Sequence, residues 1–153
     1  VAYRGREFVL ADIPGLIAGA SEGAGLGDRF LGHVERCRVL LHVVAADAPS
    51  PSAAWRTVMA ELAAYGAGLA DKPMLAALSK IDLLDARALA ARRRALEEVS
   101  GLPVLAFSAA TGAGLEALVE ALAAAVFPPG PQGSALPPSA AGGSRAEAGW
   151  SPL

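Results

Sequence analysis

Cysteine and aromatic side chains are scarce in this sequence. Cys37 is the only cysteine, which excludes an intramolecular disulfide and a cluster of thiolate metal ligands. Aromatic residues make up 5% of the 153 residues, while the hydrophobic fraction is 54%, too high for a wholly disordered chain. A core must therefore be built mainly from Leu, Val, Ile and Ala, within one domain of ordinary size. The apolar neighbours of Cys37 favour a buried structural residue over a reactive thiol.

Long apolar runs and a strong net charge are absent as well. No run reaches the ~18 residues that a membrane-spanning helix needs, and no signal peptide is visible. The net charge of −2 predicts no general attraction to nucleic acid, and no sequence-specific nucleic-acid partner is expected. We therefore expect a soluble cytoplasmic protein that does not contact a membrane.

Apolar runs alternate with amphipathic segments along the chain. The runs predict strands at about 6–11, 39–44, 74–78 and 103–107, and the spacing of apolar residues predicts helices at about 26–36, 55–69, 85–99 and 115–126. The alternation is typical of an α/β fold with a doubly wound, mostly parallel sheet, here spanning residues 1–127. Beyond Phe127 the composition changes to Pro, Gly, Ser and Ala. We expect residues 128–153 to form a disordered tail or linker.

The first candidate motif, Asp12-Ile13-Pro14-Gly15, follows the first predicted strand. Ligands of such sheets bind beyond the carboxyl ends of the strands, where a carboxylate can hold Mg²⁺ through a bound water. The backbone N–H of Gly15 can contact a terminal phosphate. The alternative is a strand-to-loop turn without a ligand.

The second motif, Ser79-Lys80-Ile81-Asp82, follows the third predicted strand. One carboxylate can accept hydrogen bonds from the N1–H and the exocyclic amine of guanine. Adenine offers no such pair, so Asp82 can discriminate between the two bases by leaving its own buried oxygens unpaired against the wrong one. The aliphatic stem of Lys80 can lie along the plane of the base. The alternative is the N-terminus of a helix with an acidic cap.

The third motif, Ser108-Ala109-Ala110, follows the fourth predicted strand. A tight turn there would offer backbone N–H groups to guanine O6, and Ser108 would hold the carboxylate of Asp82 in place. Taken alone, the motif is indistinguishable from an ordinary loop of small residues. All three motifs in this order, each after a strand, predict one guanine-nucleotide site.

This arrangement resembles the GTP-binding domain of translation-factor-like GTPases. The glycine-rich stretch 12–27 resembles the second switch of the Obg family, and residues 33–40 resemble the helix and strand that follow it. The resemblance covers about residues 1–127. It implies a P-loop NTPase fold with a Ras-like sheet, in a bacterial-type cytoplasmic GTPase that binds GTP and GDP. It also implies Mg²⁺ as cofactor and association with the large ribosomal subunit during its assembly.

Two residues depart from what is usual in such GTPases. Ser79 stands where the base-reading motif usually has Asn, so we expect modestly weaker nucleotide binding with guanine preference intact. Leu16 stands where Ras-like enzymes have the Gln that orients the attacking water. The Obg family shares this apolar replacement. It implies slow intrinsic hydrolysis and leaves no catalytic residue to assign.

The chain contains no G-x-x-x-x-G-K-[ST] phosphate loop. The family places that loop and its first switch ahead of the segment seen here, so the sequence resembles an N-terminally truncated part of an Obg-type G domain. By analogy, the strand that carries the loop lies between the strands ending near Ala11 and Ala45. Without it, we expect the 153-residue chain, expressed alone, to be unstable or to self-associate; a cooperative monomeric melt would contradict this.

Two functions remain open. The parent protein is either a GTP-hydrolysing enzyme or a truncated, non-catalytic GTPase-like module that binds a partner without nucleotide. A run of three arginines, Arg92-Arg93-Arg94, lies on a charged helix, where a solvated face is the simplest interpretation. The functional alternative is contact with phosphates of ribosomal RNA.

Overall fold

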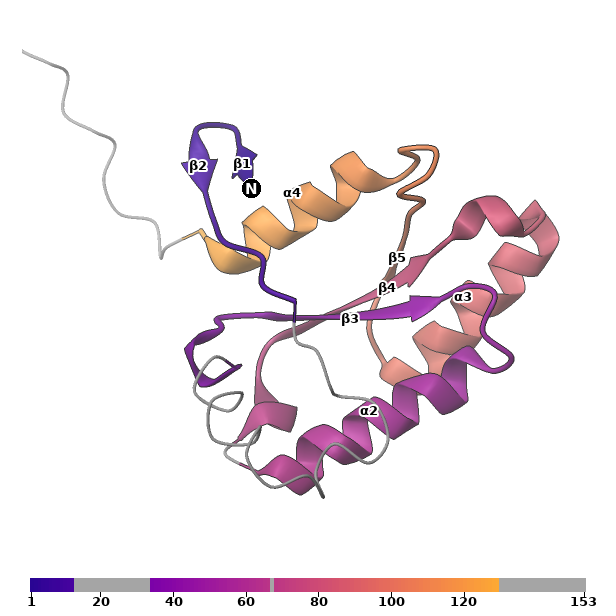
Figure 1. Cartoon of the computed structure of the whole chain (residues 1–153), viewed down its shortest axis with the longest axis horizontal. Coiled ribbons are helices and arrows are strands. Elements are labelled where there is room, and N and C mark those ends of the chain that lie inside the picture. Colours follow the sequence, from indigo (N-terminus) through magenta and orange to yellow (C-terminus); the bar gives the residue numbers. More distant parts are fainter. Residues whose placement is uncertain (13–33, 67, 130–153) are drawn as a thin grey trace, which may run out of the picture.

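A computed structural model describes residues 1–12, 34–66 and 68–129. A hairpin of β1 (Ala2–Tyr3) and β2 (Arg6–Glu7) comes first. It is followed by β3 (Leu40–Ala45), α2 (Pro51–Tyr65), β4 (Met74–Ser79), α3 (Ala86–Ser100), β5 (Val104–Ala106) and α4 (Leu115–Val126). Two single-turn 3₁₀ helices flank β4, η2 (Leu69–Asp71) before it and η3 (Ile81–Leu83) after it (Figure 1). The predicted α/β class is confirmed.

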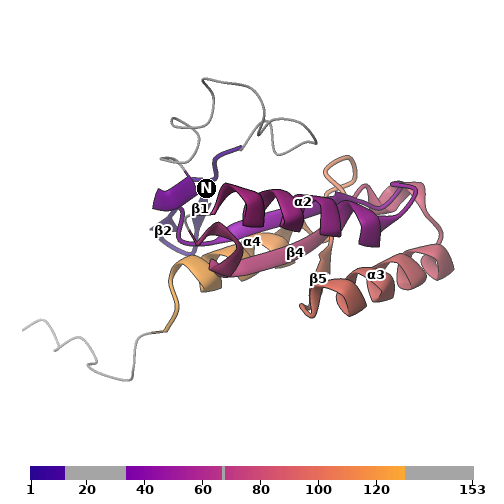
Figure 2. The same ribbon diagram turned by 90° about the horizontal axis from the view of Figure 1, so that it is seen from below.

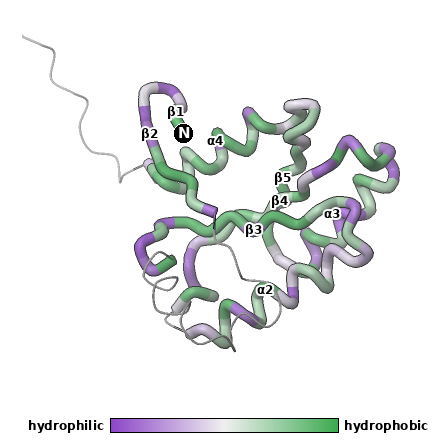
Figure 3. The backbone as a smooth tube through the Cα atoms, in the orientation of Figure 1, coloured by the Kyte–Doolittle hydropathy of each residue, from purple (hydrophilic) through white to green (hydrophobic). Residues whose placement is uncertain are grey.

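The three later strands form a parallel sheet with β4 in its centre. The register runs from Leu40↔Met74 to Ala45↔Ser79 between β3 and β4. Figure 1 shows α4 on one side of this sheet and α2 and α3 on the other, and Figure 2 shows α2 lying along β3. Because helices cover both faces of the sheet, β3 and β4 can be apolar along their whole length. Figure 3 shows these strands in the green of hydrophobic residues.

The core has a cluster on each face of β4. Ala76 and Leu78 point into a cluster with Trp55 of α2 and Leu96 of α3, whereas Ala77 points into a cluster with Leu118 of α4. All three β4 side chains are fully buried. None of the described helices is long and apolar enough to cross a bilayer.

Helix boundaries follow from local caps. The hydroxyl of Ser50 accepts a hydrogen bond from the Ala53 N–H, so α2 begins at Pro51, and it ends at Tyr65 rather than extending to residue 69. Asp85 caps α3 by accepting from the Ala88 N–H at 2.7 Å, and Gly101 ends it in the left-handed conformation. The helix expected at 26–36 lies largely outside the described residues, as does the tail from residue 130 onward.

The predicted strand at 6–11 is wrong for most of its length. β2 ends at Glu7, and the next regular backbone contact is the Phe8 N–H donating to the Val1 carbonyl at 3.0 Å. Val9 is 92% exposed and Leu10 is 56% exposed. Apolar residues form a strand only where a neighbouring strand pairs with their backbone, and beyond Phe8, which pairs with Val1, no described strand pairs with residues 9–11.

One edge of β3 is unpaired among the described strands, because β4 is its single neighbour. Residues 8–12 and 39–43 both line a groove of about 960 Å³. Val43, in the middle of the strand, is 43% exposed. A free apolar edge is an aggregation hazard, which agrees with the expected self-association of the isolated chain. That expectation stays a prediction, to be checked by light scattering.

His42 lies buried in β3, where its ring stacks on Trp55 with centroids 4.3 Å apart and an interplanar angle of 13°. Its Nδ1 is buried without a hydrogen-bond partner among the described residues. Burial lowers the pKa of His42 from 6.5 to about 4. An indole face favours a cation by only about 0.5–2 kcal/mol, so desolvation of the imidazolium dominates.

Stability should therefore fall as the pH falls from 6.5 to 4. In this window the unfolded state binds a proton at His42 that the folded state does not, so acid favours unfolding. A shift of this size corresponds to at most about 3 kcal/mol. The measurement is urea unfolding of the full-length protein from pH 7 to pH 4. His42→Phe keeps an aromatic stack without a titrating group, and an equal pH dependence in that variant would contradict the assignment.

Candidate functional site

The second and third motifs meet at the carboxyl edge of the sheet. Beyond the ends of β4 and β5, the Phe107 N–H donates to the Leu78 carbonyl at 2.9 Å and the Ile81 N–H donates to the Phe107 carbonyl at 3.4 Å. The two chain segments therefore continue side by side after the strands end. As parallel strands predict, residues 79–82 and 108–110 form one local site.

The chain turns sharply at Lys80. This residue adopts the left-handed conformation, with φ 60° and ψ 35°, which costs a residue with a side chain about 1–3 kcal/mol. Its carbonyl accepts from the Leu83 N–H at 3.1 Å, closing the single turn of η3. Because η3 starts here, Asp82 turns back toward the loop that follows β5.

Ser108 fixes the carboxylate of Asp82. The serine hydroxyl donates to Oδ1 of Asp82 at 2.5 Å and accepts from the Thr111 N–H at 3.2 Å. Ser108 is fully buried, and its own backbone N–H donates to the Ala113 carbonyl at 2.8 Å. The contact expected between Ser108 and Asp82 is present, and it leaves the second carboxylate oxygen of Asp82 without a partner among the described residues.

Asp82 lies in the first turn of η3, and the acidic cap of α3 is Asp85. Asp82 is an exposed residue in this structure. A ligand would therefore have to cover Asp82 before its oxygens leave water. Ser79, the first residue of the motif, is half-buried at the end of β4.

The turn after Ser108 contains backbone donors that have no acceptor among the described residues. Ala109 and Ala110 are exposed, and no described residue accepts a hydrogen bond from their N–H groups. The turn is closed by the Gly112 N–H, which donates to the Ser108 carbonyl at 2.9 Å. The site thus combines a fixed carboxylate acceptor with open backbone donors.

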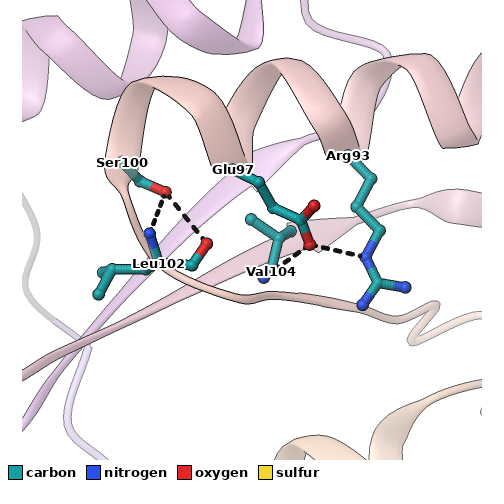
Figure 4. A network of polar contacts seen from close by, with 5 residues as sticks. All are labelled: Arg93, Glu97, Ser100, Leu102 and Val104. Atoms are coloured by element: carbon teal, nitrogen blue, oxygen red, sulfur yellow. Dashed lines mark hydrogen bonds and ion pairs between the residues drawn. The ribbon is translucent and has the colours of Figure 1, made fainter.

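The first residue of β5, the strand that precedes this turn, is hydrogen-bonded to α3. Oε1 of Glu97 accepts from the Arg93 Nε at 3.2 Å and from the Val104 N–H at 3.3 Å, at the first residue of β5. The hydroxyl of Ser100 accepts from the Leu102 N–H at 3.1 Å in the turn between them (Figure 4). These contacts tie the start of β5 to α3, and Ser108 follows shortly after the other end of this strand, which is Ala106.

The first motif is not brought to this site by any described contact. Asp12 is exposed and lies at the end of a segment that forms no strand, so it does not follow a strand of the sheet as predicted. Ile13, Pro14, Gly15 and Leu16 lie outside the described residues. The carboxyl edge of the described sheet therefore holds two of the three predicted motifs.

Two structural contributors were missed in the sequence. Asp47 forms an ion pair with Lys80, its Oδ2 lying 3.4 Å from Nζ, and nothing in the local sequence signals this contact. Gly114 lies at φ 74° before α4, where a Cβ would meet the Ala106 carbonyl oxygen at 2.0 Å. The spacing of Gly112 and Gly114 just after the third motif was a signal for this close approach.

The family profile described as 50S ribosome-binding GTPase matches residues 1–80, more than half of the chain. Over all 153 residues, the chain is 52% identical to the GTPase Obg of Zymomonas mobilis. The chain belongs to the Obg family of GTPases. It is also 56% identical over 131 residues (86% of the chain) to GTPase Obg of Sphingopyxis alaskensis, and 58% identical over 122 residues (80% of the chain) to that of Erythrobacter litoralis.

The chain spans about two fifths of the length of these relatives, namely 42%, 38% and 35%. The resemblance seen in the motifs is thus confirmed at the level of the family. The shared family and the parallel sheet agree with a partial P-loop NTPase fold.

The solvated face expected for the three arginines of α3 is present at Arg93 and Arg94, whose side chains are 50% and 81% exposed, but not at Arg92. Arg92 is half-buried, and its guanidinium donates to the Ala48 carbonyl. Arg93 and Arg94 pair with Glu97 and Glu98 one turn later on the same helix. Each arginine thus has a partner within the chain, and contact with ribosomal RNA stays a prediction.

Proposed function

We propose that this chain supplies the guanine-reading part of a domain that binds GTP and hydrolyses it to GDP and phosphate. The observation that carries the proposal is the hydrogen bond from the Ser108 hydroxyl to Asp82. It joins the two loops and fixes one carboxylate at the start of the turn in which the N–H groups of Ala109 and Ala110 have no described acceptor. Guanine presents the complementary set, two donors on N1 and N2 and an acceptor at O6.

The same arrangement disfavours adenine. A base laid over Asp82 removes the exposed carboxylate from water, and adenine then offers no pair of donors to replace the lost hydrogen bonds. Leaving a charged acceptor unpaired costs at least about 1–3 kcal/mol. Sites built to hydrogen-bond one partner reject analogues that lack the matching group by large factors.

The phosphate side of the proposal depends on Asp12. Its exposed carboxylate fits Mg²⁺, which prefers oxygen ligands and is usually held by one or two carboxylates together with waters and phosphate oxygens. When bound, the ion neutralises charge on the phosphates. Ile13, Pro14 and Gly15 are proposed to contact the terminal phosphate. Leu16 offers no group that orients water, so no catalytic residue is assigned.

The proposed partner is the large ribosomal subunit, during its assembly. The support is membership of a family described as 50S ribosome-binding GTPases. Nucleotide would set the shape of the surface that meets the subunit.

The test is displacement of a fluorescent GDP analogue from the full-length protein in the presence of Mg²⁺. We expect GDP to displace the analogue at concentrations at least about 100-fold lower than ADP, since two missing hydrogen bonds to a carboxylate amount to several kcal/mol. Equal displacement by ADP would overturn the guanine assignment. No binding of the analogue would favour the alternative, a partner-binding module without nucleotide.

A further inference from the structure

We infer that Asp47 is a positioning residue for Lys80, and through it for the base. The inference rests on the proposed nucleotide site. Oδ2 of Asp47 lies 3.4 Å from Nζ of Lys80, across 33 residues of sequence, and the two side chains are 42% and 57% exposed. No other described residue contacts this ammonium group through an ion pair or hydrogen bond.

The sheet brings Asp47 to this place. The ladder between β3 and β4 continues to Ala45↔Ser79, and beyond it the Ala46 N–H donates to the Ser79 carbonyl at 2.9 Å. The backbone contact between the two chain segments thus extends one residue past β3. The residues that follow this contact, Asp47 and Lys80, leave the sheet side by side.

The backbone that carries Asp47 is held at two further points. The Ala48 N–H donates to the Ala45 carbonyl at 3.1 Å, which closes a tight turn. The Arg92 guanidinium donates to the Ala48 carbonyl and ties the turn to α3. Ala46 is fully buried. Asp47 thus extends from a fixed backbone, which makes its carboxylate a defined anchor for a flexible side chain.

A lysine side chain has four rotatable bonds and loses much rotamer freedom when it is ordered. The left-handed backbone of Lys80 fixes where its stem begins, and Asp47 fixes where its ammonium group ends. With both ends held, the aliphatic stem is ordered before a base packs along it, so less entropy is lost on binding.

The experiment is a double-mutant cycle in the full-length protein, read by affinity for a fluorescent GDP analogue. Asp47→Asn removes the charge at constant shape, and Lys80→Met keeps the aliphatic stem without the ammonium group. We expect Asp47→Asn to weaken binding two- to five-fold with Lys80 present, the range of an exposed ion pair. The same substitution should change binding by less than about 1.5-fold in the Lys80→Met background, where the pair no longer exists.

The matched control is Asp71→Asn, an exposed acid in η2 at the opposite end of β4, which should leave affinity unchanged. The weakening caused by Asp47→Asn should shrink in about 1 M salt, which a purely structural role would not produce. An unchanged affinity, a tighter affinity, or an equal effect in both backgrounds would overturn the inference. If unsubstituted protein fails to bind the analogue, the proposed function itself fails, and the inference fails with it.

Discussion

Replacing Asp82 by Asn should move the nucleotide preference of the full-length protein from guanine to xanthine. The amide oxygen of Asn can still accept from the N1–H of the base, but its NH₂ group faces the exocyclic amine of guanine, donor against donor. Xanthine has a carbonyl oxygen at that position and accepts from the amide instead. We expect affinity for GDP to fall by at least about 100-fold, because two hydrogen bonds to a charged acceptor are weakened or lost.

The measurement is competition by GDP and XDP against a fluorescent GDP analogue, or a fluorescent XDP analogue for the variant. Asp85→Asn is the matched control, since Asp85 is an exposed acid three residues away that caps α3 and Asn is an equally good cap. That variant should keep guanine preference. A preference for guanine retained by Asp82→Asn would show that Asp82 does not read the base.

Ser108 orients the carboxylate of Asp82 without a bound nucleotide. This buried hydroxyl has a single hydrogen, which it donates to Asp82, and it accepts from the Thr111 N–H. Its position is thus set by the turn that follows β5 rather than by the ligand. The carboxylate that we propose to read the base is thus held by the fold of residues 108–114, so the conformation of that turn bears on the whole candidate site.

The part of this site that follows from parallel strands could be predicted from the sequence. Apolar runs at 74–78 and 103–107 identified buried strands, and parallel strands end at the same edge. The polar residues after each run, Asp82 and Ser108, therefore had to lie close together. Each of these two strands can be recognised from its own apolar run, without knowledge of the rest of the chain.

Other features depend on partners far along the chain. Residues 9–11 have the apolar composition of a strand, yet without a described neighbouring strand they form none. The pairing of Asp47 with Lys80 depends on the register between β3 and β4, which composition does not encode. The left-handed turn at Lys80 arises at a residue type with no preference for it, so no local rule predicts it.

The expected effect of Gly114→Ala is a large loss of stability in the turn that carries Ser108. A Cβ at this position would lie 2.0 Å from the Ala106 carbonyl oxygen and 3.1 Å from the Phe107 Cα. Both contacts are with backbone at the end of β5, so no side-chain rotation relieves them. Gly114 also adopts φ 74° as the residue preceding α4. We expect a loss of at least about 3 kcal/mol, since strain and steric overlap both contribute.

Gly112→Ala is the matched control, because it separates the two contributions. Gly112 has φ 81°, but no heavy atom lies within 4 Å of the position that an added methyl group would occupy. It should lose only the conformational part, about 1–2 kcal/mol. Urea unfolding of the full-length protein gives the total loss of stability, and amide exchange of α4 shows where in the fold the loss occurs.

Because Ala106 and Phe107 lie directly before Ser108, displacing them should also weaken GDP binding in Gly114→Ala. Equal losses in both variants would mean that the close approach at Gly114 does not support the turn.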